Sequence, residues 1–349
     1  MKKDIKNLTL KELEGFFSSL NEKKYRAKEV FNAIYKEKRE NFSEITTLSK
    51  ELRKTLDNIF YITTFKEVSR KTSKDDATKF VFELSDKRLI ESVLIKNTNN
   101  IGRTWFTACL STQVGCSMAC QFCATGKMGL IRNLEAGEIV EQFLQLEKIS
   151  PVSNIVFMGM GEPLLNYENV KKAIEILTDE NGRELGKRRI TISTSGITPM
   201  IYKLADEIPS VKLAISLHAA IQRKRDSLMP GLKNYPLNKL KEALIYYNER
   251  TGNTVTLEYL LIDNVNDTKS DAEALLKFSR DLKFVKVNLI HYNEIPSISF
   301  KPSKKEIEFQ KFLLSNGLRT TLRLSKGTDV SAACGQLATN SKESLQFKI

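Results

Sequence analysis

FTACLSTQVGCSMACQFCATGKMGLIRNLEAGEIVEQFLQLEKISPVSNIVFMGM (residues 106–160) holds one complete unit of a repeating architecture. An apolar, strand-like run at 106–112 leads into a cysteine-rich loop. An amphipathic run at 135–148 follows, with the spacing of a helix, and a second apolar strand occupies 154–160. Strand, helix and strand in this order are typical of a parallel sheet covered by helices.

The same alternation continues toward the C-terminus. Helical runs stand at 236–250 and 270–282, between further strand-like segments. About six such units predict an α/β fold, a partial (β/α)6 barrel whose active site forms at the C-terminal ends of the strands. The further strand-like segments are 189–195, 211–218, 254–262, 285–292 and, as a possible last strand, 318–325.

The region before the barrel has two different patterns. Residues 1–65 read as helical, and Thr9 with Glu12 has the spacing of a capping box. Two β-rich runs, 78–84 and 88–96, are joined by a short polar turn. We expect a helical accessory domain at 1–65, a β extension or linker at 66–104, the barrel core at 105–337 and a frayed tail at 338–349.

The charge balance favours a polyanionic partner. The 349 residues carry 55 basic and 42 acidic side chains, a net charge of +13, and RNA or DNA is the obvious candidate. A basic but merely solvated surface is the alternative. The sequence has no transmembrane run and no secretory signal, so we expect a cytoplasmic protein. Basic clusters stand at 186–189, 222–225 and 301–305, and the second is expected to contact phosphates near the active site.

Three of the five cysteines fall close together, at Cys116, Cys120 and Cys123. Thiolates are soft ligands that suit zinc or iron–sulfur clusters. A structural zinc site needs four ligands, usually in two pairs, and neither the other two cysteines nor the two histidines, His218 and His291, form a second pair. Two alternatives therefore stay open: a catalytic cluster with one open metal position, and a zinc-bound RNA-binding protein without catalysis.

The cysteine spacing Cys-x3-Cys-x2-Cys after the first barrel strand resembles the signature of the radical S-adenosylmethionine (SAM) superfamily. The order of further motifs resembles the RlmN/Cfr family of RNA methyltransferases, which act on adenosine. The resemblance covers nearly the whole chain, because the N-terminal YRAKEVFNAIY is similar to that family's accessory domain. The ordered motifs are CQFCATGKMGLIRNLEAGEIVEQ, FMGMGEPLLNYENV, ITISTSGI, SLHA, EYLLIDNVND, VNLIHYN and AACGQL.

The resemblance implies a set of cofactor-binding residues. Cys116, Cys120 and Cys123 would hold a [4Fe–4S] cluster, whose open iron binds SAM. Glycine and a carboxylate in GMGEP would suit close contact with the SAM amino group. The implied SAM contacts are Gly161, Glu162, Ser193, Ser216, Leu217, His218 and Asn293.

The remaining cysteines acquire roles through the same resemblance. Cys334 would take a methyl group from one SAM, and a second SAM would be cleaved to a 5′-deoxyadenosyl radical that removes hydrogen from this S-methylcysteine. The carbon radical would add to adenine, and Cys109 would resolve the adduct by forming a disulfide with Cys334. Glu91 matches the family's proton acceptor, although the Cys109 thiolate could also remove that proton.

The family has two branches. The motifs GEPLLN, STSG and SLHA of this sequence resemble the RlmN branch. Cfr-type proteins have motifs similar to GEAL, STIG and SLHS at the same places. We therefore expect methylation of adenine C2 in the peptidyl-transferase region of 23S rRNA and beside the anticodon of tRNA. The alternatives are Cfr-type C8 methylation, which confers antibiotic resistance, and a different radical SAM reaction. The resemblance also implies a flavodoxin-type electron donor, two SAM per turnover and a monomer.

Overall fold

One ten-stranded sheet runs through the molecule, whose computed structural model describes residues 2–337. The strand order is β14-β13-β12-β11-β10-β9-β6-β5-β4-β3, and the strands from β6 to β14 are parallel in this sheet. These parallel strands are β6 (Thr104–Cys109), β9 (Val152–Phe157), β10 (Ile190–Thr194), β11 (Lys212–Ser216), β12 (Val255–Leu261), β13 (Val285–His291) and β14 (Thr320–Arg323). The predicted α/β barrel is confirmed, including its last strand.

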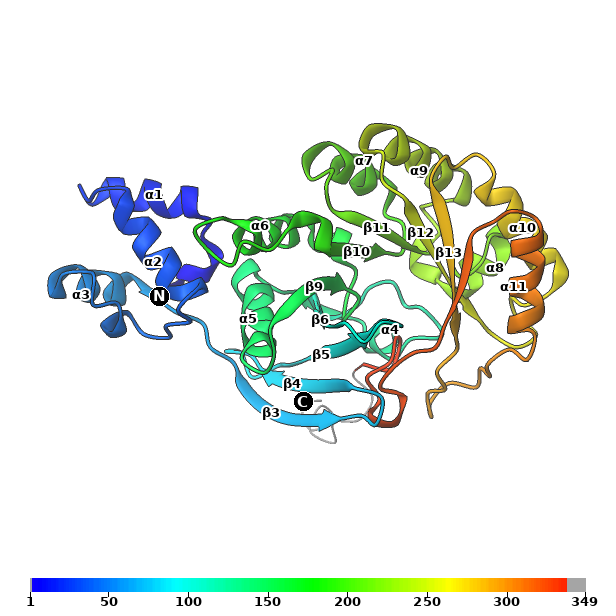
Figure 1. Cartoon of the computed structure of the whole chain (residues 1–349), viewed down its shortest axis with the longest axis horizontal. Helices are drawn as coiled ribbons and strands as arrows, with labels where there is room; N and C mark the ends of the chain where they lie inside the picture. The colour runs from blue at the N-terminus through cyan, green and yellow to red at the C-terminus, as the bar shows by residue number, and fades with distance from the viewer. Residues whose placement is uncertain (1, 338–349) are drawn as a thin grey trace.

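Helices connect the parallel strands and lie outside the curved sheet (Figure 1). Their apolar faces supply the core; in α5, for example, Ile139, Val140 and Phe143 are fully buried. The opposite, inner side of the sheet is left for the site. The helices are α5 (Ala136–Glu147), α6 (Tyr167–Thr178), α7 (Thr198–Glu207), α8 (Gln222–Leu228), α9 (Leu237–Thr251), α10 (Lys269–Ser279) and α11 (Glu306–Ser315).

The N-terminal module is helical and forms one end of the molecule (Figure 1). Its helix α1 begins with the predicted capping box, in which the Glu12 N–H donates to Thr9 Oγ1 at 3.2 Å and the Thr9 N–H to Glu12 Oε2 at 2.8 Å. The module contains β1 (Lys3–Asp4), η1 (Ile5–Asn7), α1 (Leu10–Ser19), α2 (Tyr25–Tyr35), η2 (Phe42–Glu44), α3 (Lys50–Ile59) and β2 (Phe60–Tyr61).

Residues 66–104 continue the barrel sheet with antiparallel strands. β4 (Ala77–Glu83) and β5 (Leu89–Thr98) match the two predicted runs, while β3 (Lys66–Thr72) was not expected. β3 is a polar edge strand without the alternation that marks a half-buried strand. β5 pairs with β6 and sets Val93 opposite Cys109, so this sheet extension reaches the site.

Short elements complete the fold. The hairpin β7 (Gln113–Gly115) and β8 (Leu130–Asn133) encloses the small helix α4 (Ala124–Met128). The remaining 3-10 turns are η3 (Pro163–Asn166), η4 (Lys187–Arg189), η5 (Pro230–Leu232) and η6 (Thr328–Val330). Within residues 2–337 no helix is long and apolar enough to span a bilayer. The tail expected at 338–349 lies outside the described residues.

Candidate active site

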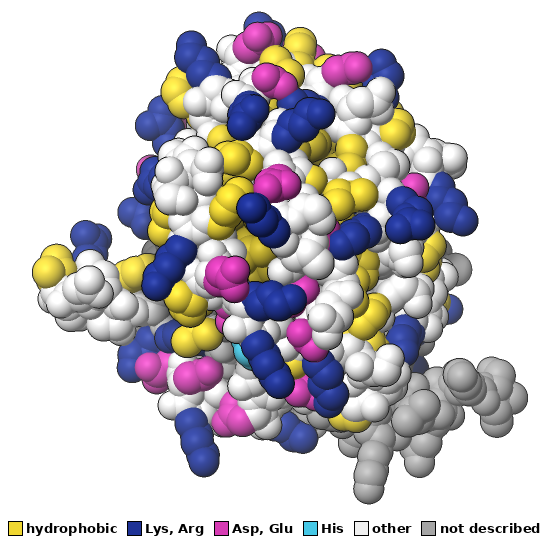
Figure 2. Space-filling model, turned by 90° about the vertical axis from the view of Figure 1, so that its right-hand side faces the viewer, with side chains coloured by type: hydrophobic (Ala, Val, Ile, Leu, Met, Phe, Trp, Pro, Cys, Tyr) yellow, Lys and Arg dark blue, Asp and Glu magenta, His cyan; other side chains and the backbone are white. Residues whose placement is uncertain are grey.

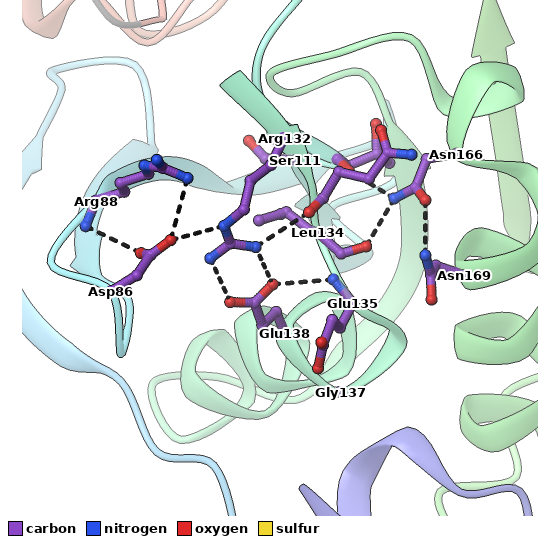
Figure 3. A network of polar contacts seen from close by, with 12 residues as sticks. Asp86, Arg88, Ser111, Arg132, Leu134, Glu135, Gly137, Glu138, Asn166 and Asn169 are labelled. Atoms are coloured by element: carbon purple, nitrogen blue, oxygen red, sulfur yellow. Dashed lines mark hydrogen bonds and ion pairs between the residues drawn. The ribbon is translucent and has the colours of Figure 1, made fainter. Parts of the chain in front are cut away.

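The three clustered cysteines lie on a loop that is closed at its base. We call residues 112–134 the cysteine loop. The Leu134 N–H donates to the Thr112 carbonyl at 3.0 Å, across the two ends of the loop. The side-chain amide of Asn166, in η3, donates to the carbonyls of both Thr112 and Leu134 at 2.8 Å each (Figure 3). Both ends of the loop are therefore fixed by one buried amide.

An ion-pair network holds the same loop from the side (Figure 3). The Arg132 guanidinium, on β8, donates to both carboxylate oxygens of Glu138 at 2.7 and 2.8 Å. Arg132 Nε donates to Asp86, in the β4–β5 turn, at 2.7 Å. A bidentate pair of this kind has a fixed geometry. Arg132 thus joins the cysteine loop to helix α5 and to the sheet extension.

A cavity of about 160 Å³ opens beside this loop, at the C-terminal ends of the parallel strands. Cys116, Cys120 and Cys123 all line it, and we call it the cysteine-loop cavity. It also gathers residues from the turns after β9, β10 and β11, as the sequence predicts. The predicted SAM-contact residues among its walls are Gly161, Glu162, Ser193, Ser216 and His218.

Burial keeps the three thiols neutral in the absence of a cation. Desolvation raises the pKa of Cys116 to about 12 and also raises the pKa of Cys120 and Cys123. In the described residues, no three histidine, cysteine, aspartate or glutamate side chains are grouped tightly enough for a single metal ion. Three thiols that line one cavity fit a multi-iron cluster, in which each thiolate binds a different iron, better than a four-ligand zinc site.

Glu162 is fully buried, and its carboxylate is already hydrogen bonded. Oε1 accepts from the Leu164 N–H at 3.0 Å and from Thr194 Oγ1 at 2.7 Å, and Oε2 accepts from the N–H and Oγ of Ser195, both at 2.7 Å. Burial raises the pKa of Glu162, against these bonds. Four donors occupy the lone pairs that an ammonium group would use, so this side chain braces the loops after β9 and β10.

Gly161 permits a close approach at the same turn. Its φ is +101°, and a Cβ there would lie 2.5 Å from the Cβ of Gln113. Gln113 Oε1 in turn accepts from the Glu162 N–H at 2.8 Å. The glycine therefore lets the turn after β9 seat against the base of the cysteine loop.

His218 has a strained backbone and a neutral ring. Its φ is +54°, and its Nδ1 accepts from the Leu260 N–H at 3.1 Å. Desolvation, reinforced by the charge of Arg225, lowers the pKa of His218 to about 3. The neutral ring carries its proton on Nε2 and can donate one hydrogen bond. Phe122, from the cysteine loop, packs edge-on to the imidazole at 4.8 Å between ring centroids.

A second cavity, of about 220 Å³, adjoins the first. Cys109, at the end of β6, lines only this one, which we call the Cys109 cavity. Cys334 and Arg323 line both. Desolvation, reinforced by Cys334 nearby, raises the pKa of Cys109 to about 12. The two isolated cysteines of the sequence therefore meet where the two cavities join.

Two charged residues of the site were not expected. Arg323 ends β14, and the nearby Cys334 is the main influence that raises its pKa. Glu258, on β12, accepts from Asn288 Nδ2 at 3.0 Å through Oε1, while its buried Oε2 has no hydrogen-bond partner among residues 2–337. Burial raises the pKa of Glu258. The sequence signal for Glu258 was one charge inside a largely apolar run, whereas the run at 318–325 also holds Arg319 and so does not single out Arg323.

Three predicted site residues lie outside the walls of both cavities. Leu217 is fully buried, and its carbonyl accepts from Arg225 Nε at 3.3 Å. Asn293 Nδ2 donates to Ser325 Oγ at 2.9 Å and to the Cys334 carbonyl at 3.4 Å. Asn293 thus contacts residues 324–337, which we call the Cys334 segment. Glu91 is buried on β5, where Lys79 lies 3.3 Å from its Oε1.

The basic clusters do not combine into one patch. Figure 2 shows one face of the barrel, on which lysine and arginine side chains are scattered among acidic ones. The cluster at 186–189 precedes β10 and so lies at the end of the sheet opposite the site. In the cluster at 222–225, Arg225 is completely buried and Lys224 pairs with Asp271 at 2.7 Å. The expectation that the cluster 222–225 contacts phosphates is therefore wrong for the buried Arg225 and stays a prediction for the exposed Arg223.

The chain is similar to known proteins in both sequence and fold. Residues 110–278 match the Radical SAM superfamily, and residues 3–62 match the Ribosomal RNA large subunit methyltransferase N-terminal domain. The chain is 43% identical to the probable dual-specificity RNA methyltransferase RlmN of Cytophaga hutchinsonii, over 97% of this chain and 93% of that one. It is 45% identical to the same-named protein of Thermotoga maritima, over 96% and 97%. A radical SAM methyltransferase from Sphaerobacter thermophilus superposes with a TM-score of 0.90 at 40% identity, over 97% of this chain and 100% of the other.

Proposed function

We propose the following chemistry from one premise, that the chain belongs to the RlmN family of dual-specificity radical SAM RNA methyltransferases. Its function is the methylation of RNA, at C2 of adenine in 23S rRNA and in tRNA. Membership of the radical SAM superfamily implies a [4Fe–4S] cluster and SAM. The observation that supports the individual steps is the position of Cys334, which faces both the cysteine-loop cavity and the Cys109 cavity.

Cys116, Cys120 and Cys123 are the proposed ligands of the cluster. When bound, the cluster supplies the electron for reductive cleavage of SAM. The side chains make this possible by losing their protons to form thiolates, a change that burial opposes and bound iron favours. The closed base of the cysteine loop holds the three cysteines at the cysteine-loop cavity.

The remaining walls of that cavity are proposed to orient SAM. Ser193, Ser216 and the Nε2–H of His218 offer neutral donors and acceptors, while the buried carboxylate of Glu162 favours the positive ammonium through its charge. Gly161 keeps the backbone close to the ligand. Leu217 is proposed to support the site through its carbonyl, which accepts from Arg225. Asn293 is proposed to support it by donating to the Cys334 carbonyl.

Cys334 is proposed as the methyl carrier. As a thiolate, its sulfur would take a methyl group from one SAM, which would leave as S-adenosylhomocysteine. A second SAM would be consumed in removing a hydrogen atom from that S-methyl group, and the carbon left would bond to adenine C2. The adduct would give one electron to the oxidised cluster and its C2 proton to a base, for which Glu91 and Cys109 are the candidates. Cys109 would then attack the Cys334 sulfur as a thiolate, although burial holds it as a thiol at rest. An S–S bond would form, the S–C bond would break, and the released carbon would take up a proton to become the methyl group. An electron donor such as a flavodoxin system would reduce the resulting disulfide.

We divide the chain into a helical module at 1–65, a β extension at 66–104 and a barrel core at 105–337. RNA contact is proposed for the helical module. The target adenosine must leave its stack to reach a cavity at the strand ends, as in other base-modifying enzymes. We propose that the enzyme works as a monomer in the cytoplasm.

Nucleoside mass spectrometry tests the proposal. Reconstituted enzyme, SAM and a reductant are incubated with 23S rRNA and with tRNA that lack the modification, and 2-methyladenosine is the expected product in both. 8-Methyladenosine alone would place the enzyme with the Cfr-type proteins. Cys334→Ala is expected to cleave SAM but to yield no methylated RNA, and unchanged methylation would contradict the carrier role.

A further inference from the structure

Arg225 is a buried charge without a carboxylate partner. Its exposed fraction is 0%, and its guanidinium donates from Nε to the Leu217 carbonyl and from Nη2 to the Ser195 carbonyl. Among residues 2–337, the buried Nη1 has no hydrogen-bond partner and Arg225 forms no ion pair. A buried and unpaired charge of this kind is strongly destabilising unless an anion is supplied.

The guanidinium lies directly behind the wall of the cysteine-loop cavity. Its two carbonyl partners belong to the turns after β10 and β11, which carry the cavity residues Ser195 and His218. Gly196, with a φ of +109°, leaves room for this approach, because a Cβ there would lie 3.3 Å from Arg225 Nη2. The fold therefore makes space for a charge at this place.

The same helix rests on the cysteine loop. The Gln121 N–H donates to the Leu228 carbonyl at the end of α8, at 2.9 Å. The Gly231 N–H donates to the Met118 carbonyl at 3.1 Å, and a Cβ on Gly231 would lie 2.7 Å from the Cα of Met118. The residues on either side of Cys120 are thus bonded to the segment that carries Arg225.

Electrostatics agree with these contacts. Burial lowers the pKa of Arg225 to about 10, and the strongest opposing influence is Cys120, ahead of the neighbouring Asp226. With Cys120 as a neutral thiol, the acidic influence left on the guanidinium within residues 2–337 is that of Asp226, with which it forms no ion pair. An anionic thiolate at Cys120, in contrast, would offset the unpaired charge.

We infer that Arg225 is a positioning residue that supplies the buried countercharge of the iron–sulfur cluster and makes the cluster easier to reduce. The inference rests on the proposed assignment of Cys120 as a cluster ligand. Reduction adds one electron and so one negative charge beside a fixed positive charge, which stabilises the reduced form. No side chain changes its bonding in this step, and the electron comes from the external donor.

A reductive titration followed by electron paramagnetic resonance tests the inference. In Arg225→Gln, the ratio of reduced to oxidised cluster at a fixed potential is expected to fall on the order of tenfold, which for a one-electron couple is about 59 mV. Arg223→Gln is the matched control, because it removes an exposed charge from the same helix. Its ratio is expected to stay within about twofold of the parent value at moderate ionic strength.

Arg225→Lys separates charge from hydrogen bonding, since lysine keeps the charge but lacks the fork that reaches both carbonyls. It is expected to keep the ratio within about threefold of the parent value. A tenfold fall in Arg225→Lys, or no fall in a cluster-loaded Arg225→Gln, would overturn the inference even if the other variant is insoluble. Iron and sulfide analysis of the parent protein distinguishes a failure of this inference from a failure of the proposed function. A parent protein that binds no cluster would refute the proposed function itself.

Discussion

The two adjoining cavities are built by different means. The walls of the cysteine-loop cavity are fixed by a closed loop, a bidentate arginine pair and a glutamate that accepts four hydrogen bonds. The Cys334 segment beside the Cys109 cavity is irregular apart from the short turn η6, with positive φ at Gly327, Ser331 and Gly335. Separate hydrogen bonds hold it at intervals: the Gly327 N–H donates to Asp75 at 2.9 Å, the Lys74 N–H donates to Asp329 at 3.2 Å, and the Ala124 N–H donates to the Gly335 carbonyl at 2.8 Å.

This difference matches two chemical needs. Cluster ligands must keep one geometry through every turnover, and buried hydrogen bonds give the cysteine loop that rigidity. The proposed methyl carrier has to face SAM first and a second thiol later, and Cys334 lines both cavities on a segment whose regular structure is limited to the turn η6. The proposed cluster ligands lie on a loop fixed by a buried network, whereas the proposed carrier lies on a segment held by separate hydrogen bonds.

The largest expected effects come from substituting one cysteine of each cavity. Cys120→Ala should abolish cluster absorbance, SAM cleavage and RNA methylation together, because a proposed ligand of the cluster is lost. Cys109→Ala should keep the cluster and SAM cleavage but stall after addition to adenine, leaving RNA joined to the protein. Absorbance near ~400 nm, 5′-deoxyadenosine yield and gel shift of labelled RNA measure the three outcomes. Loss of the cluster in Cys109→Ala would break the distinction between the cavities.

A smaller effect is expected at the base of the cysteine loop. Asn166→Ala removes the amide that bonds both loop ends and leaves the Leu134 carbonyl without that donor, so the free energy of unfolding should fall by about 2–3 kcal/mol. The amount of iron bound per chain should fall with it. Urea unfolding and iron analysis measure both.

Asn169→Ala is the matched control, because among residues 2–337 the Asn169 amide donates to Asn166 Oδ1, at 2.8 Å, and to neither loop end. It should cost no more than about 1 kcal/mol and should leave iron binding unchanged. Equal effects in the two variants would show that the loop base is not what stabilises the cluster site.

The smallest effect is a pH dependence of stability from His218. Its pKa is lowered from 6.5 in the unfolded chain to about 3 in the fold, so below pH 6.5 the unfolded chain binds a proton that the native state excludes. Stability is thus fully present above pH 6.5 and is lost as the pH falls, at up to about 1.4 kcal/mol per unit. Urea unfolding of the cluster-loaded protein between about pH 7 and pH 5.5 measures this slope.

His218→Asn should flatten the slope, since asparagine tolerates the positive φ and does not titrate. His291→Gln, which removes a partly exposed histidine outside both cavities, should retain the acid loss contributed by His218. A slope unchanged in His218→Asn would place the acid sensitivity elsewhere.

Much of this architecture could be predicted from local patterns. Apolar strands alternating with amphipathic helices predicted the parallel strands, and Thr9 with Glu12 predicted the start of α1. The edge strand β3 could not be predicted, because its sequence KEVSRKT is polar on both faces and gains its pairing from β4 alone. An apolar pattern reveals a strand through its buried side chains, and an edge strand such as β3 buries few of them.

The site was predictable in its cysteines and less so in its charges. Arg225 stands in a run of polar and basic residues, a pattern typical of a solvated surface, yet the chain buries it against two carbonyls. Arg323 and Glu258 are far apart in the sequence, and the pairing of β13 with both β12 and β14 brings them to the same cavity. Such positions depend on tertiary packing, which spacing along a chain does not encode.

The contact between Lys6 and Glu141 has a consequence for the order of synthesis. These fully buried side chains form an ion pair between the first turn of the chain and helix α5, and the Asn7 side chain accepts from the Gly137 N–H at the start of the same helix at 2.7 Å. Domains generally fold as they leave the ribosome, N-terminal part first. Here the earliest residues must wait for more than a third of the chain, because their partners include the helix that follows the cysteine loop. A nascent chain therefore does not complete the N-terminal helical module before it has made the cysteine loop.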